Sequence, residues 1–377
     1  MPLSRSSSMS LSLHSRRTSS STKSSISSPI RTAFGCPTYR STTLEPNHIF
    51  VEDQQMDEER WSRLAFALGI PSRDSHPPSP AASKFAQQVS SRRSVSSREM
   101  AELLVPLLAS IAKDHETVKS RTNTAFHHDG VPDDIPDFEV ERGWKMHLPT
   151  PKPAITMGYV RGTFTTHELD LQQGIIANSK NEPCDLHKLS QPVPDVYWPF
   201  FVVETQEESM SAARNACAGS GATCNNTLMI LAGAAQERQK YRHDMDSLWN
   251  LNKAAQSFSL AVNGKTACLN THNSEGCLPH AVAAIRTYRL DDGRDVEALA
   301  SRIRSILIWA ENCRLQSILD LLDDFNNRVG LAHKAMTEPQ DRYIPTHPAD
   351  FGVVPKSRRG AIKEVIKESL PRWVRTC

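Results

Sequence analysis

The segment Trp198–Val203, followed by Glu204, constrains the fold of this chain most strongly. Its four consecutive apolar residues are typical of a strand that is buried on both faces of a sheet. The stretch 209–240 is rich in small residues and predicts a helix, although Gly219 and Gly221 weaken its middle turn. A carboxylate at the end of an apolar strand is costly to bury without a partner or a metal ion. Glu204 is therefore the first candidate for chemistry.

The N-terminal part of the chain has a different composition. Residues 1–30 contain fourteen serines, four basic residues and no acidic residue. Such a segment cannot bury enough apolar surface to offset its ordering entropy, which predicts disorder. We expect residues 1–97 to form a disordered tail rich in Ser, Arg and Pro, with a short amphipathic helix at 57–68.

The order of patterns downstream predicts an α/β or α+β domain over residues 98–330, with a central mixed sheet flanked by helices. Residues 331–377 are expected to form a loose basic tail with a short amphipathic helix. Asn263-Gly264 between two β-like runs indicates a hairpin. The expected elements are a helix from 98 to about 119, strands at 154–159, 198–205, 257–262, 265–270 and 281–290, and a long helix from 296 to about 325.

The composition limits the cellular compartments and the kinds of binding partner that the chain is expected to have. No run of eighteen apolar residues occurs, which predicts no contact with the membrane interior. Without a signal-peptide pattern, a nuclear or cytoplasmic location with reduced cysteines is expected. The Ser- and Arg-rich start also fits a mitochondrial transit peptide, but it lacks a helical apolar stripe, so that location is less favoured. The net charge of +2 is too small to indicate nucleic-acid binding by itself.

Two stretches give the chain a family resemblance. Pro153-Ala154 before a strand, and Phe-Phe-Val-Val-Glu-Thr-Gln at 200–206 before a helix, resemble the restriction-endonuclease-like (PD-(D/E)XK) nucleases. Their signature is Pro-Asp on one strand and acid-x-Lys on the next. The stretch from about 98 to 330 also resembles an uncharacterised fungal domain family with a similar layout, through YWPFFVVE, NACAGSGATCNN and SLAVNGKTACLNTH. The resemblance implies a restriction-endonuclease-like core and Mg²⁺-dependent phosphodiester hydrolysis, with Glu204 as a metal ligand.

The nuclease signature is degenerate in this chain. Residues i and i+2 of a strand share a face, so Gln206 occupies the place of the signature lysine beside Glu204. Glutamine can orient a water molecule but adds no positive charge. Ala154 stands where the resemblance implies the metal-binding Asp. Asp195 is a substitute acid, but an extended chain would place it ~30 Å from Glu204 unless residues 197–199 turn the chain back. A helix acid, Glu99 or Glu102, is a further candidate ligand.

A second group of residues has zinc-binding side chains. Cys268, His272, Cys277 and His280 lie within thirteen residues, and zinc takes such ligands at ~2.0–2.3 Å. Their spacing matches no standard zinc finger, and a buried cysteine with a nearby loop histidine is the alternative explanation. The cluster His127-His128-Asp129 falls in a polar stretch, where the sequence favours a solvated turn.

Three functions fit these observations. Ala154 and Gln206 favour a catalytically impaired nuclease-like domain that binds nucleic acid or protein and needs no cofactor. The alternatives are an active Mg²⁺-dependent nuclease that recruits Asp195 or a helix acid, and a protein-interaction scaffold with flexible tails and no role with nucleic acid.

Overall fold

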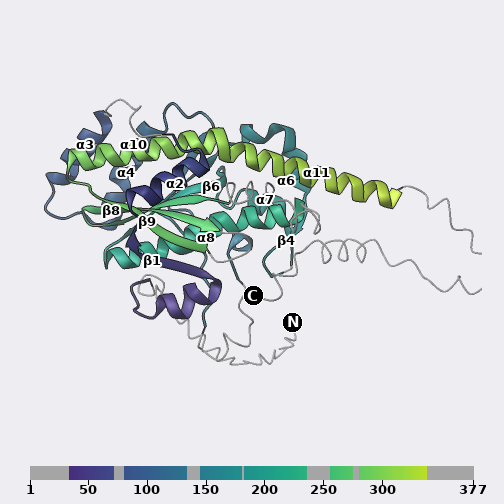
Figure 1. Ribbon diagram of the computed structural model, residues 1–377, viewed down its shortest axis with the longest axis horizontal. Helices are drawn as coiled ribbons and strands as arrows, with labels where there is room; N and C mark the ends of the chain where they lie inside the picture. The colour runs from purple at the N-terminus through teal and green to yellow at the C-terminus, as the bar shows by residue number, and fades with distance from the viewer. Residues whose placement is uncertain are drawn as a thin grey trace, which may run out of the picture.

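A seven-stranded mixed sheet forms the centre of the protein in the computed structural model, which describes residues 34–71, 80–133, 145–180, 182–235, 255–274 and 280–337 (Figure 1). The strand order is β1-β9-β8-β7-β6-β3-β2. This sheet and its flanking helices confirm the expected α/β fold. The strands are β1 (Ile49–Gln55), β2 (Val118–Thr122), β3 (Ile155–Tyr159), β6 (Tyr197–Gln206), β7 (Ser257–Asn263), β8 (Thr266–Ser274) and β9 (His280–Arg289).

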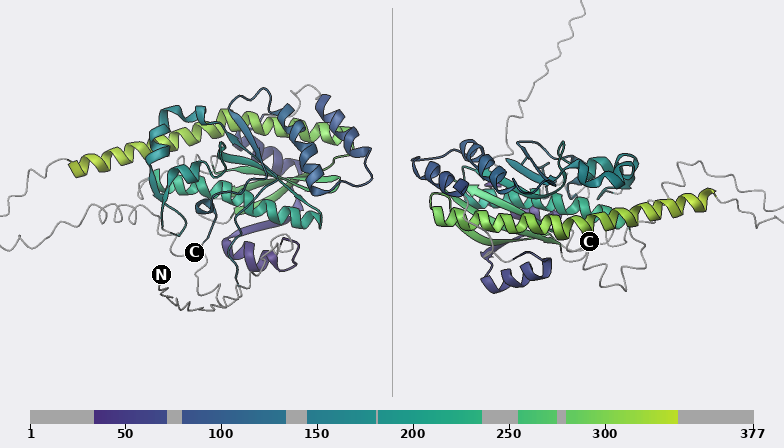
Figure 2. Two further views of the ribbon diagram at one scale, coloured as in Figure 1. Left: turned by 180° about the vertical axis from the view of Figure 1, so that it is seen from behind. Right: turned by 90° about the horizontal axis from the view of Figure 1, so that it is seen from above.

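Helices cover both faces of this sheet (Figures 1 and 2). The long helix α8 packs on one face, against β6, β7, β8 and β1, whereas α4 and α10 pack on the other. A two-stranded sheet lies apart from the main one. The remaining elements are η1 (Arg40–Leu44), η2 (Glu45–Asn47), α2 (Glu58–Leu68), α3 (Pro80–Ser90), α4 (Ser97–Ile111), η4 (His128–Gly130), η5 (Arg161–His167), α6 (Glu168–Gln173), β4 (Ile175–Ala177), β5 (Pro183–Asp185), α7 (Leu186–Ser190), α8 (Met210–Ala235), α10 (Gly293–Trp309), η7 (Ala310–Arg314) and α11 (Leu315–Thr337).

The apolar strand predicted from the sequence is β6, an interior strand of the sheet. It pairs antiparallel with β3 and parallel with β7. Phe201 and Val203 enter the main core that α4 and α10 close. Val202 packs with Cys224 of α8, so this residue and Glu204 face the opposite side of the sheet. Burial on both faces explains the continuous apolar run.

Helix α4 begins and ends for reasons that are visible in the sequence. Ser96 is its N-cap, and Glu99 completes a capping box by accepting the Ser96 backbone N–H at 3.0 Å. The Glu99 carboxylate, a candidate ligand from the sequence, is engaged here as a cap. The helix continues through Pro106 but stops at Ile111, because the following residues turn and then form β2.

The predicted hairpin is present as β7 and β8. Asn263 pairs with Thr266 across the turn, and Gly264 has a φ of 55°, in the left-handed region that glycine adopts without strain. The Asn-Gly turn therefore sets the register that places Ser259 opposite Asn270 and Ser257 opposite His272.

The structure differs from the tail expected over residues 1–97. Strand β1 pairs in parallel with β9 at the edge of the sheet, and α3 buries Phe85 and Val89 in the main core. These elements are hard to foresee because β1 is mostly polar and α3 has only a narrow apolar face. The short helix expected at 57–68 is α2, whereas residues 1–33 lie outside the described residues.

The long C-terminal helix contains a π-helical turn, η7, between α10 and α11. This turn directs Arg314 into the interior, where its guanidinium donates to the carbonyls of Trp198 at 3.0 Å, Pro199 at 3.2 Å and Gln256 at 3.2 Å. The arginine thus fixes the entry into β6. Helix α11 continues to Thr337, past the expected boundary at 330, and the predicted basic tail beyond it falls outside the described residues.

Among the described helices, none combines the length and the hydropathy that a membrane-spanning helix requires.

Candidate functional site

Glu204 lies near the carboxyl end of β6, with its carboxylate against α8. Only 7% of the residue is exposed, and the Ser220 hydroxyl donates a hydrogen bond to Glu204 Oε1 at 2.6 Å. Burial raises the pKa of Glu204 to about 7, although the Ser220 hydrogen bond opposes that rise. The side chain is therefore a mixture of acid and carboxylate at neutral pH.

The segment before β1 closes over this carboxylate. Tyr39 is buried there, and its pKa is raised by burial and then by the negative charge of Glu204. Helix α8 holds the segment in place. Asn215 accepts a hydrogen bond from Arg40 Nε at 2.9 Å and donates one to the Phe34 carbonyl at 2.9 Å. Glu204 is thus enclosed by the sheet, α8 and residues 34–44.

The structure places positions 154, 204 and 206, which the resemblance compares with a nuclease signature, close to one another. The Ala154 backbone N–H donates to the Val203 carbonyl at 2.9 Å, so position 154 lies beside the end of β6. Gln206 follows Glu204 on the same face and is half-buried, and its carbonyl accepts a hydrogen bond from Asn263 Nδ2 at 2.9 Å. Of the two signature acids, this site has only Glu204.

The structure places Asp195 far from this site. Asp195 precedes β6 and forms ion pairs with Arg121 and with Lys119, the latter at 3.7 Å. Tyr197 pairs with Tyr159 and Val203 pairs with Ile155, four residues along β3, so about 13 Å separates the start of β6 from Val203, the neighbour of Glu204. A bulge at Trp198, whose φ is 44°, shortens the strand but leaves Asp195 at its far end, so the expectation that Asp195 could replace the missing acid is not met.

The proposed zinc ligands are not assembled either. Cys268 and His272 are four residues apart on β8, which separates them by about 13 Å. One zinc ion with bonds of about 2.0–2.3 Å does not bridge that distance. His280 lies on β9, opposite Ser274, and Cys277 falls outside the described residues.

His272 instead belongs to a buried polar layer between the sheet and α8. Its Nε2 lies 2.8 Å from Ser259 Oγ, and burial lowers the pKa of the imidazole to about 3. Ser259 Oγ also accepts from Asn270 Nδ2 at 3.3 Å, and Asn270 Oδ1 accepts from Arg214 Nε at 3.3 Å. These partners come from distant parts of the sequence. The small residues of α8 were the one sequence signal of the close packing between this helix and the sheet.

A pocket of about 600 Å³ opens at the other end of β6 from Glu204. Its wall combines cationic, acidic and aromatic side chains, and Tyr197 lines it at the start of the strand. The charged side chains and the histidine among its lining are Lys119, Arg161, Glu168, His187 and Asp195.

Comparison with known proteins identifies the family of the chain. Residues 85–322 match the family described as Domain of unknown function (DUF7924), and the chain belongs to this family. No curated protein matches the chain. No solved structure matches it.

Proposed function

We propose that this DUF7924 protein has a nuclease-like domain that does not hydrolyse phosphodiesters and that acts by binding nucleic acid or protein. The observation that carries the proposal is the state of Glu204. Its carboxylate is buried against Ser220, while Ala154 and Gln206 occupy the two other positions of the signature.

The arrangement of strands supports the nuclease-like part of the proposal. Helix α4 leads into β2, β3 and β6, three antiparallel neighbours in the main sheet, with the two-stranded sheet inserted between β3 and β6. Helix α8 then leads into β7, which is parallel to β6. Strands β3 and β6, which would carry the two halves of the signature, are neighbours in the interior of the sheet.

The chemistry of the site supports the loss of hydrolysis. Mg²⁺ requires oxygen ligands in an octahedral geometry and retains several of its water molecules. Glu204 offers one carboxylate with a raised pKa, and Oε1 already accepts from Ser220. The next acid, Glu207, points toward α4 and accepts the Ser97 backbone N–H at 3.2 Å. No lysine stands at 206 to orient an attacking water.

The pocket at the opposite end of β6 supports a binding role. Lys119 of the edge strand β2 and Arg161 line the pocket, and the partly exposed Arg121 of β2 pairs with Asp195 of the lining. Asp195 and Glu168 balance these charges. The pocket is therefore of mixed charge, which suits either a nucleic-acid backbone or a charged peptide.

The absence of hydrolysis is the first expected result. The purified chain should leave single- and double-stranded DNA and RNA intact in millimolar Mg²⁺, as followed by denaturing gel electrophoresis. Glu204→Gln, prepared in the same way, controls for a contaminating nuclease, because a contaminant acts equally in both samples. Cleavage by the natural chain that Glu204→Gln abolishes would contradict the proposal.

The same preparation distinguishes the two kinds of partner. Fluorescence anisotropy of a labelled oligonucleotide should show binding at low salt that weakens steeply as salt rises, because bound cations displace counterions from the phosphates. If the anisotropy shows no binding of the oligonucleotide even at low salt, protein binding becomes the favoured function of the domain.

A further inference from the structure

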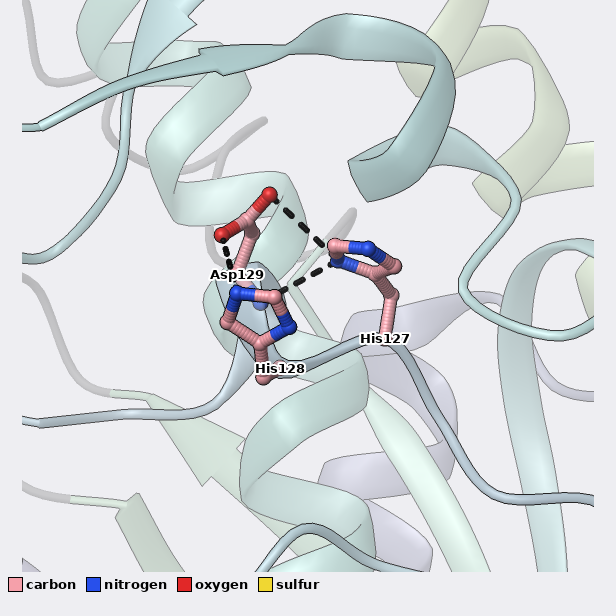
Figure 3. Close-up of side chains that lie close together, drawn as sticks. All are labelled: His127, His128 and Asp129. Atoms are coloured by element: carbon pink, nitrogen blue, oxygen red, sulfur yellow. Dashed lines mark hydrogen bonds and ion pairs between the residues drawn. The ribbon is translucent and has the colours of Figure 1, made fainter. Parts of the chain in front are cut away.

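His127, His128 and Asp129 turn their side chains toward one another (Figure 3). His127 Nδ1 lies 3.3 Å from Asp129 Oδ2, and His128 Nε2 lies 3.2 Å from Asp129 Oδ1. The two imidazole rings are stacked, with centroids 4.5 Å apart. One potential ligand atom from each of the three residues lies within 4.8 Å of the other two.

The backbone holds this cluster in place. The residues form the short 3-10 turn η4, and the His127 N–H donates to the Pro192 carbonyl at 2.8 Å. Asn226 of α8 donates to the Gly130 carbonyl at 3.0 Å. A Cβ on Gly130 would lie 2.6 Å from Thr227 Cγ2, which shows how closely the turn packs on α8. The backbone that carries the three side chains is therefore held in place by α8 and by Pro192.

The distances fit the geometry of a metal centre. Four ligands at about 2.0–2.1 Å around a tetrahedral ion lie about 3.3 Å from one another. The separations of Asp129 from His127 and from His128 are close to that value, although each nitrogen faces a different oxygen of the carboxylate. With one ligand atom taken from each residue, all three lie within 4.8 Å, so small side-chain rotations would close the site on an ion. Two imidazoles and one carboxylate form a donor set that suits Zn²⁺ and related divalent transition metals, and three protein ligands leave a fourth position open.

We propose that His127, His128 and Asp129 form a binding site for one Zn²⁺ ion with an open fourth position. His128 is 76% exposed along its side chain, which gives the ion a path from solvent and leaves room for a water molecule or a donor group from a partner. The site lies about 10 Å along α8 from Ser220, because seven residues separate Ser220 from Thr227. It is independent of the Glu204 site and of the proposed function.

Ordinary ion pairing explains less of this arrangement. One histidine is sufficient to form an ion pair with Asp129. Here both rings direct a nitrogen at the same carboxylate from neighbouring positions in the chain. A shared cation accounts for that convergence.

Isothermal titration calorimetry of the full chain with Zn²⁺ tests the proposal. We expect one equivalent to bind, and Asp129→Asn and His128→Ala to weaken its affinity at least tenfold, or about 1.4 kcal/mol. His187→Ala is the matched control, because His187 is an exposed histidine of nearby α7 outside the cluster. Its affinity should stay unchanged. Melting temperatures measured without metal show whether each variant is folded. If Asp129→Asn is unfolded, the Zn²⁺ affinity of His128→Ala alone tests the proposal.

Co²⁺ as a spectroscopic probe separates this site from the cysteines of the chain. The proposal predicts visible d–d bands without a thiolate-to-cobalt charge-transfer band, and loss of those bands in His128→Ala. The proposal is overturned if Zn²⁺ does not bind, if the variants bind it as the natural chain does, or if the cobalt spectrum shows thiolate ligation.

Discussion

Replacing Gly221 with alanine should lower the free energy of unfolding by about 3 kcal/mol, near the upper end of what overpacking a core costs. A Cβ at this position would lie 2.4 Å from His272 Nδ1 and 2.5 Å from two further atoms of the same ring. The ring has no room to retreat, because His272 is fully buried and its Nε2 is engaged with Ser259. Helix α8 must therefore shift away from the sheet. Urea unfolding followed by circular dichroism measures the loss.

Gly219 provides a matched control on the same helix. A Cβ there would lie 3.3 Å from Leu148 Cδ1, the end of a flexible side chain. Alanine also favours a helix over glycine by up to about 1 kcal/mol, so Gly219→Ala should be close to neutral. In a double-mutant cycle, His272→Ala should recover part of the loss caused by Gly221→Ala. Equal stabilities for Gly219→Ala and Gly221→Ala would contradict the close approach of α8 to β8.

Glu204→Gln should stabilise the protein at alkaline pH by up to about 3 kcal/mol and have little effect near pH 4. Burial raises the pKa of Glu204 in the folded state from its ordinary value of 4.5 to about 7. Between those values the folded state binds more protons than the unfolded state, so stability falls as pH rises and reaches its full loss above pH 7. A glutamine carries no charge at any of these pH values, and its oxygen can still accept from Ser220.

Two buried histidines also make stability depend on pH, so the unfolding curve of the natural chain must be subtracted from that of Glu204→Gln. Burial lowers the pKa of His272 to about 3 and that of His280 to about 4. These groups stay neutral in the folded state while the unfolded chain protonates them, so they reduce stability as pH falls below about 6.5. They act equally in both proteins. The difference between the urea-unfolding curves of Glu204→Gln and the natural chain, measured from pH 4 to pH 8, isolates Glu204, and parallel curves would contradict its burial.

Local signals in the sequence predicted the parts of the fold that local chemistry controls. The apolar run of β6 and the Asn263-Gly264 turn each depend on residues close together in the chain. The clustering of Ala154 and Gln206 beside Glu204 followed from strand periodicity and from the resemblance to a nuclease layout.

Long-range contacts explain what the sequence did not reveal. Nothing near Glu204 indicates that Ser220, sixteen residues later, donates to its carboxylate. Strand β1 joins the sheet through β9, more than two hundred residues away, and its polar sequence gives no sign of that partner. The sequence suggests Asp195 as a substitute acid because it follows Pro194, as in the Pro-Asp of the signature. Its ion pair with Arg121 of β2 is a long-range contact that the sequence does not reveal.

The glycines of α8 show how one signal supports two interpretations. From propensity alone, Gly219 and Gly221 weaken the middle turn of the helix. In the structure the helix is continuous, and Gly221 allows it to approach His272 on the sheet. The missing side chain therefore serves packing between helix and strand, and only the position of β8 reveals this.

The central claim is that Glu204 is an enclosed acid and does not hold a metal ion. Its most direct test is the pKa of the Glu204 carboxyl, measured by NMR on protein with ¹³C-labelled glutamate and assigned with Glu204→Gln. The structure predicts a pKa of about 7 that millimolar Mg²⁺ leaves unchanged. A pKa near the ordinary 4.5, or one that falls when Mg²⁺ is added, would show an open metal-binding carboxylate and contradict the claim.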